Sequence, residues 1–227
     1  HGWYRRQRQM CIRDREIETF LEDYVYYALL MITLYEVNAD KKALEKSIKI
    51  MNDTWELFFN KETQLFQKNI IKDNDLFASP LDLNDSNIPN GNSVYLLISN
   101  KLYSITNDKI WSERNEVLKK SFHQVLNSYY SQMFSFIKTL DICDNSLSFT
   151  FSGTSQSIKE IQLYLQKEYL GVATFVYQLN NDTKPSVIIC KNQTCSNKLA
   201  NISEAVEYLS KSCLLYTSDA ADDTNRV

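Results

Sequence analysis

Two segments of the chain repeat one pattern at an offset of 68 residues. The string LYEVNADK at 34–41 matches LYSITNDK at 102–109. In each copy, apolar residues at steps of three and four precede and follow a short Asn/Asp break, a pattern typical of two helices joined by a tight turn. The breaks supply Asp40 and Asp108, which are the expected N-caps of the second helices. Since one hairpin cannot bury its apolar face alone, the repeat predicts hairpins stacked on one another.

Composition agrees with a helical chain. The 227 residues include only four glycines and three prolines, which disfavours turn-rich all-β folds. The net charge of -3 gives no basic field for nucleic acid, and no apolar run is long enough for a membrane helix. We therefore expect neither nucleic acid nor membrane among the partners.

The repeat is longer than those of common helical solenoids, because an insertion near 60–90 separates the two hairpins. Large insertions on one rim are a feature of α/α toroids. A fifth helical stretch runs through Met133 to Leu140. From 144 onward the pattern changes to strands at 147–152, 172–177 and 187–190, with a helix after the first and a capping box at 201–204. The predicted fold class is mainly α: a partial α/α six-hairpin toroid at 16–143, then a small α/β unit at 144–212.

The two ends of the chain share one DNA string. Reverse-complementing the codons that can encode 5–14, and shifting the frame, yields the residues at 213–222. Such a string is typical of a translated sequencing adapter, so residues 1–15 and 213–227 are expected to be non-native and unpacked. The credible body would then be a piece of a longer protein. Its location stays open, with the cytoplasm favoured.

Three segments carry a resemblance to a known family: Glu22–Tyr24, Ile88–Ser93 and Val187–Cys195. Together they resemble the C-terminal portion of the YyaL / spermatogenesis-associated protein 20 family. The resemblance implies a thioredoxin-like domain upstream, joined to a six-hairpin α/α barrel similar to glycosidases and N-acylglucosamine 2-epimerases. It further implies carbohydrate-related binding or turnover, with the reaction open. The alternative is a non-catalytic barrel that serves as an interaction scaffold beside a redox module.

The repeat also predicts where a site would lie. Asp23 plus 68 is Gly91, so the clusters at 22–24 and 90–93 open equivalent helices and should share one rim, about 10 Å apart. Asp23 and Asp85 are the candidate catalytic carboxylates of a glycosidase-like pair. The candidate ligand-binding residues, for a sugar or other small polar ligand, are Glu22, Tyr24, Asn90, Gly91, Asn92 and Ser93. The alternative is that Asp23 and Ser93 cap helices and Asp85 holds a loop.

The remaining reactive side chains give weaker patterns. Cys190 and Cys195 are favoured as two separate structural thiols, with a reversible redox disulfide as the alternative. No metal site and no cofactor are expected, because no second Cys/His pair accompanies these cysteines. His123 is interpreted as structural or surface, and aromatic residues such as Trp55 and Trp111 as core. Hairpins without all their neighbours should leave apolar side chains exposed, and the missing N-terminal half of the protein is the expected partner.

Overall fold

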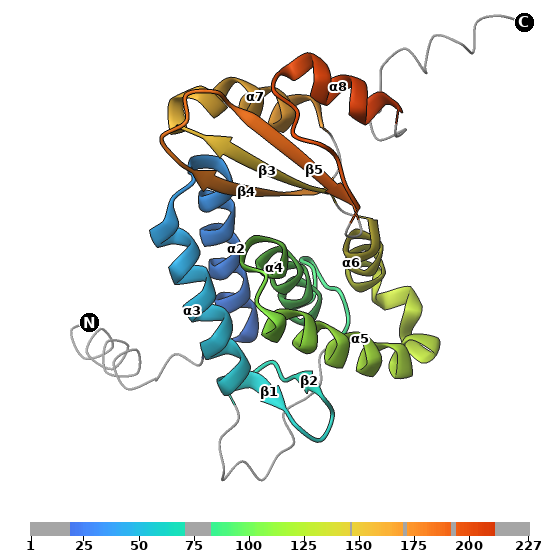
Figure 1. Cartoon of the computed structure of the whole chain (residues 1–227). Helices are drawn as coiled ribbons and strands as arrows, with labels where there is room; N and C mark the ends of the chain where they lie inside the picture. The colour runs from blue at the N-terminus through green and yellow to red at the C-terminus, as the bar shows by residue number, and fades with distance from the viewer. Residues whose placement is uncertain (1–18, 71–82, 146, 170–171, 192–193, 212–227) are drawn as a thin grey trace, which may run out of the picture.

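A computed structural model describes residues 19–70, 83–145, 147–169, 172–191 and 194–211. The predictions for 1–15 and 213–227 lie outside these residues. A layer of helices forms one half of the molecule, and a four-stranded sheet lies across one end of it (Figure 1). Two further helices cover the outer face of this sheet, so that the sheet lies between helices on both sides (Figure 1).

The helical half consists of two hairpins and one further helix. Its elements are α2 (Leu21–Asn38), α3 (Lys41–Phe58), α4 (Gly91–Thr106), α5 (Lys109–Tyr129), the short 3₁₀ turn η1 (Tyr130–Gln132) and α6 (Phe134–Asn145). Because only two residues separate the helices within each hairpin, the chain reverses direction there. The two predicted hairpins are therefore present, and they span 21–58 and 91–129.

The two hairpin turns are equivalent residue by residue. Ala39 and Asn107 end the first helices in the left-handed conformation, with φ of 56° and 55°. Asp40 and Asp108 then cap the second helices, each accepting a hydrogen bond from the backbone N–H two residues later. Both predicted N-caps are confirmed, and the turns lie 68 residues apart.

The first helices of the two hairpins run parallel and side by side. At their N-terminal ends, a Cβ atom added at Gly91 would lie only 2.7 Å from Cδ2 of Leu21. Near the other end, Nζ of Lys101 in α4 lies 2.7 Å from Oε1 of Glu36 in α2. The helix ends keep the 68-residue spacing, whereas α2 begins half a turn earlier than the repeat predicts.

Aromatic side chains fill the space between the hairpins. The ring of Trp55 stacks on Phe59 at 3.9 Å between centroids and meets Phe66 edge-on. The guanidinium of Arg114 lies between the Trp55 and Trp111 rings, at 4.7 and 5.1 Å from their centroids, and joins α3 to α5. The interpretation of these tryptophans as core is therefore confirmed.

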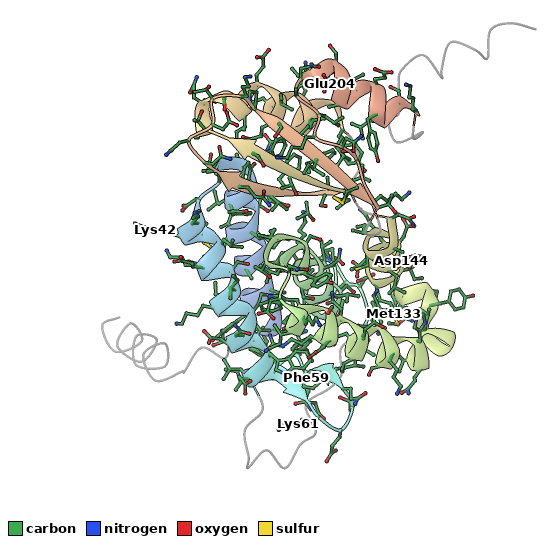
Figure 2. The ribbon with its side chains drawn as sticks, viewed as in Figure 1. Lys42, Phe59, Lys61, Met133, Asp144 and Glu204 are labelled. Carbon is green, nitrogen blue, oxygen red and sulfur yellow. A yellow bond between two sulfur atoms is a disulfide. The ribbon has the colours of Figure 1, made fainter. Side chains whose placement is uncertain are left out.

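The insertion between the hairpins begins with a small β-hairpin that the sequence analysis did not predict. Strand β1 (Phe59–Asn60) pairs antiparallel with β2 (Leu65–Phe66). Figure 2 shows Phe59 and Lys61 at the end of the molecule remote from the sheet. Residues 71–82 of the insertion lie outside the described part of the chain.

The α/β unit contains the predicted βαβ crossover. Its elements are β3 (Leu147–Gly153), α7 (Ser155–Glu168), β4 (Ala173–Leu179), β5 (Ser186–Lys191), β6 (Thr194–Cys195) and α8 (Ile202–Lys211). The strand order is β4-β3-β5-β6; β3 and β4 are parallel and the other pairs are antiparallel. The Asn201 side chain accepts a hydrogen bond from Glu204 N–H, as in the predicted cap of α8. The fold class is confirmed: mainly α, with stacked helical hairpins followed by a small α/β unit.

Side chains of the helical half satisfy the free edge of β4. Oε1 of Glu36 accepts from Phe175 N–H at 3.2 Å, and Nζ of Lys101 donates to the Ala173 carbonyl at 2.8 Å. The Tyr35 hydroxyl accepts from Tyr177 N–H at 3.2 Å. An unpaired strand edge would otherwise leave these groups without partners, so the contacts fix the sheet on the ends of α2 and α4.

Candidate functional site

The N-terminal ends of α2 and α4 meet at one rim, at the end of the helical layer remote from the sheet. A cavity of about 220 Å³ opens there between the start of α2 and the loop that enters α4. The described residues that line it are Phe20, Glu22, Asp23, Lys68, Asn84, Ser86, Ile88, Pro89 and Asn90. The prediction that the two clusters share one rim is therefore confirmed by this shared cavity and by the contact between Leu21 and Gly91.

Glu22 and Asp23, in the first turn of α2, line this rim cavity. Asp23 is exposed, and its Oδ2 accepts a hydrogen bond from Phe20 N–H at 3.0 Å. Oε1 of Glu22 is 3.4 Å from the Cβ position at Gly91, which places it between the two helices. A carboxylate in the first turn is favourable because it faces the positive end of the helix dipole. Asp23 thus helps to cap α2, as the alternative interpretation expected, and also lines the cavity.

Asp85 connects the loop above the rim to two helices. Its Oδ1 accepts from Asn90 N–H at 3.0 Å, and its Oδ2 accepts from Ser135 N–H at 2.7 Å. The Ser135 hydroxyl donates to the same carboxylate, and Asp85 N–H donates to the Gln132 carbonyl at 2.7 Å. With both oxygens engaged near the start of α6, Asp85 holds the loop, as the alternative expected. It is not among the described residues that line the cavity.

The start of α4 is fixed by side chains that the sequence analysis assigned to a ligand. Oδ1 of Asn90 caps α4 by accepting from Asn92 N–H at 2.9 Å, and Asn90 also lines the cavity. The Asn92 side chain is buried and pairs with the backbone N–H and carbonyl of Phe66, at 2.8 and 3.1 Å. Gly91 allows the close approach of Leu21, and the buried Ser93 hydroxyl has no hydrogen-bond partner among the described residues. Of this group, only Asn90 reaches the cavity wall.

Two tyrosines of α2 lie near the rim in different ways. The ring of Tyr24 packs edge-on against Phe58, with 5.2 Å between the ring centroids. This candidate ligand-binding residue therefore packs against the hydrophobic core. The Tyr26 hydroxyl donates to the Pro89 carbonyl at 3.1 Å and ties α2 to the loop before α4. Burial, followed by the charges of Glu22 and Asp85, raises the pKa of Tyr26. Tyr26 was missed because the contact joins positions 63 residues apart.

Lys68 was also missed by the sequence analysis. Its carbonyl accepts from Leu21 N–H at 2.9 Å, and the following residue bridges to Phe20. These contacts bring the segment after β2 to the start of α2, where Lys68 supplies a cation to the cavity lining beside Glu22 and Asp23. No sequence motif predicts that Lys68 lines the cavity, because only the fold of the segment after β2 brings it to the start of α2.

Cys190 and Cys195 form a disulfide. They are directly opposite each other across β5 and β6, with 4.0 Å between their Cα atoms. The favoured expectation of two separate thiols is therefore wrong, because the antiparallel pairing of β5 and β6 places the two residues opposite each other. Cys195 is exposed on the edge strand of the sheet. A redox role for the pair stays a prediction.

The other candidate groups are placed away from the rim cavity. His123 is exposed on α5, as the surface interpretation expected. Within the described residues, no cluster of three His, Cys, Asp or Glu side chains is arranged to hold a metal ion. In the same part of the chain, no helix combines the length and apolar character needed to cross a membrane.

Comparison with solved structures finds a likeness of fold. The chain is similar to a glycoside hydrolase family 76 mannosidase from Bacteroides thetaiotaomicron VPI-5482, with 17% sequence identity and a TM-score of 0.37. The match covers 47% of this chain and 28% of the mannosidase chain, so the chain spans under a third of that protein's length. No family model and no curated protein matches the sequence.

Proposed function

We propose that the rim cavity binds a carbohydrate or another small polar ligand. The observation that carries this proposal is the composition of the cavity wall. Residues that carry carboxylate, amide, hydroxyl and ammonium groups line it together with the apolar residues Phe20, Ile88 and Pro89. A sugar presents hydroxyl groups along its edge and C–H groups on its faces, and a mixed wall of this kind can contact both.

Within this proposal, Glu22 and Asp23 accept hydrogen bonds from ligand hydroxyls, and Lys68 and Asn84 contribute polar contacts. Asp85 acts as a positioning residue, because it fixes the loop that carries Asn84 and Ser86. A direct catalytic role for Asp23 and Asp85 stays a prediction, since hydrolysis of a glycoside requires two carboxyl groups on opposite sides of one bond. The test compares the rate of glycoside hydrolysis by the full-length protein with the rates of its Asp23→Asn and Asp85→Asn variants.

We further propose that the chain is the C-terminal part of a thioredoxin-domain-containing protein of the YyaL / spermatogenesis-associated protein 20 family. Two of the segments that carry the resemblance, 22–24 and 88–93, contribute residues to the cavity wall. The third contains the Cys190–Cys195 pair. Upstream coding sequence with a thioredoxin-like domain and a Cys-x-x-Cys pair is the expected result, and an unrelated upstream domain would contradict it.

Equilibrium binding to a panel of neutral monosaccharides, amino sugars and sugar acids tests the proposed site. We expect saturable binding by at least one class, weakened about tenfold by Glu22→Gln, since a hydrogen bond to a charged group contributes about 1.5–3 kcal/mol. Glu62→Gln is the matched control, because Glu62 is exposed on the β1–β2 hairpin outside the cavity. Binding that is indifferent to Glu22→Gln would contradict the proposal.

The second candidate function is a non-catalytic scaffold. Two observations favour it: the interior between the hairpins is filled by the chain's own aromatic side chains, and one face of α2 exposes large apolar residues. A scaffold would bind protein through that face and leave the rim cavity without a small ligand. Absence of binding across the whole sugar panel, together with protein association through α2, would favour this function.

A further inference from the structure

One face of α2 exposes a continuous apolar stripe. Tyr27, Leu30, Leu34 and Val37 are 48%, 52%, 37% and 51% exposed, although all four side chains are large and apolar. Their spacing of three and four residues aligns them on one side of the helix over nearly three turns. Scattered apolar residues on a surface need no explanation, but an aligned stripe marks a contact surface.

The repeat shows what such a stripe does elsewhere in this chain. Adding 68 to the four positions gives Tyr95, Ile98, Leu102 and Ile105 in α4, each of the same or a closely similar residue type. Tyr95, Ile98 and Leu102 are completely buried. The same face is therefore covered in the second hairpin and uncovered in the first.

The preceding hairpin helps to cover the stripe of α4. The Tyr95 ring packs on Phe66 and Trp55, at 4.3 and 6.0 Å between centroids, and its hydroxyl lies 3.4 Å from the Met51 carbonyl of α3. Leu21 of α2 meets the start of α4, and Lys101 of α4 reaches Glu36. The α4 stripe is thus part of an interface between successive hairpins, and the α2 stripe occupies the equivalent position one repeat earlier.

We propose that the α2 stripe, defined as Tyr27, Leu30, Leu34 and Val37, docks a further helical hairpin of the same repeat series. That hairpin packs on α2 as the α2–α3 hairpin packs on α4, with its first helix parallel to α2. The repeat gives α2 the same apolar side chains that α4 uses, so the partner is a helical hairpin with a complementary apolar face. The proposal is independent of any ligand at the rim cavity.

A lengthened variant tests this inference directly. It carries a second copy of residues 19–86, one full repeat, inserted immediately before Thr19, so that an in-register hairpin precedes α2. Leu30→Cys is introduced in the original copy alone, and its alkylation is followed by peptide-level mass spectrometry. Alkylation should slow about tenfold relative to Leu30→Cys in the unlengthened chain, because a buried thiol reacts only after local opening. Leu163→Cys, exposed on α7, is the control and should keep its rate.

A second substitution separates docking from a general loss of stability. Leu34→Asp should leave the unfolding midpoint of the unlengthened chain unchanged, because Leu34 is exposed there. Combined with Leu30→Cys in the original copy of the lengthened variant, it should restore the fast alkylation of that cysteine. An unchanged alkylation rate in the lengthened variant, or an added repeat that stays unfolded, would overturn the proposal. Protection of Leu30→Cys in the unlengthened chain through dimer formation would also overturn it, since a second copy would then be the occupant.

Discussion

Lys101 and Glu36 form a buried ion pair under the free edge of β4, with Nζ and Oε1 2.7 Å apart. Each partner also holds a backbone group of β4: the Ala173 carbonyl in one case and Phe175 N–H in the other. The pair therefore connects α2, α4 and the sheet through one set of charge-assisted hydrogen bonds. It is one of several polar links between the two halves; another is the hydrogen bond that Gln162 Nε2 donates to the Val37 carbonyl at 2.8 Å.

Lys101→Met should destabilise the protein by about 3–5 kcal/mol, because the substitution leaves the Glu36 carboxylate buried without its cation. Urea unfolding followed by circular dichroism measures the change. Lys46→Met on the exposed face of α3 is the matched control and should alter the free energy of unfolding by less than about 0.5 kcal/mol. Equal effects of the two substitutions would show that the pair does not link the halves.

Gly91→Ala should destabilise the protein by about 1–3 kcal/mol through overpacking, because the new Cβ would lie 2.7 Å from Cδ2 of Leu21. Leu21→Ala removes the opposing atoms, so the double variant should be less destabilised than the sum of the single variants. Thermal unfolding of the three variants gives this coupling, and Ser104→Ala at an exposed position of α4 is the control. Simple additivity would contradict the close approach of α2 and α4.

Stability should fall as the pH rises above about 10. Burial is the main cause that raises the pKa of Tyr95 and Tyr177 above the ordinary value. In the unfolded chain these hydroxyls lose their protons near pH 10, whereas in the folded protein they stay protonated. Since the unfolded state then binds fewer protons, the free energy of unfolding decreases with pH.

Unfolding free energies measured between about pH 8 and 11 test this dependence. Tyr95→Phe should reduce the alkaline slope, although it also removes the hydrogen bond to Arg114 and lowers stability at every pH. An unaltered slope in Tyr95→Phe would mean that Tyr95 titrates alike in both states.

Reduction of the Cys190–Cys195 disulfide should cost at most about 2 kcal/mol, because the bond closes a very short loop. Both thiols should react with an alkylating reagent only after reduction. Peptide-level mass spectrometry measures the alkyl groups added to each cysteine. Cys143 is an internal reference, since burial raises the pKa of its thiol to about 11 and keeps it largely protonated at pH 8. Alkylation of Cys195 without reductant would contradict the disulfide.

Local signals in the sequence were sufficient for much of the fold. Asp40 and Asp108 cap helices by accepting hydrogen bonds from backbone N–H groups only two residues later. The segment 147–152, with its alternating pattern, forms most of β3. Such features depend only on residues that are close together in the chain, so they can be predicted from a single sequence. The 68-residue repeat extended this local information to the packing of α2 beside α4 and to the shared rim.

The site depended on contacts that no local pattern contains. The carboxylate of Asp85 meets Ser135, 50 residues away, and the Asn92 side chain pairs with Phe66 across 26 residues. Residue type alone could not distinguish a carboxylate that holds a loop from one that faces a ligand. Lys68 entered the cavity wall only because the insertion folds back on α2.

The most direct measurement is a ¹⁵N-NMR titration of the chain with the sugar class that binds in the equilibrium panel. The proposed site predicts chemical-shift changes confined to the backbone amides of the rim cavity, with Phe20, Glu22 and Asn90 among those that move. Amides of α7 and α8 should stay unchanged, because these helices lie beyond the sheet (Figure 1). Shifts centred elsewhere in the fold, or no shifts with any member of the panel, would contradict a ligand site at the shared N-terminal ends of α2 and α4.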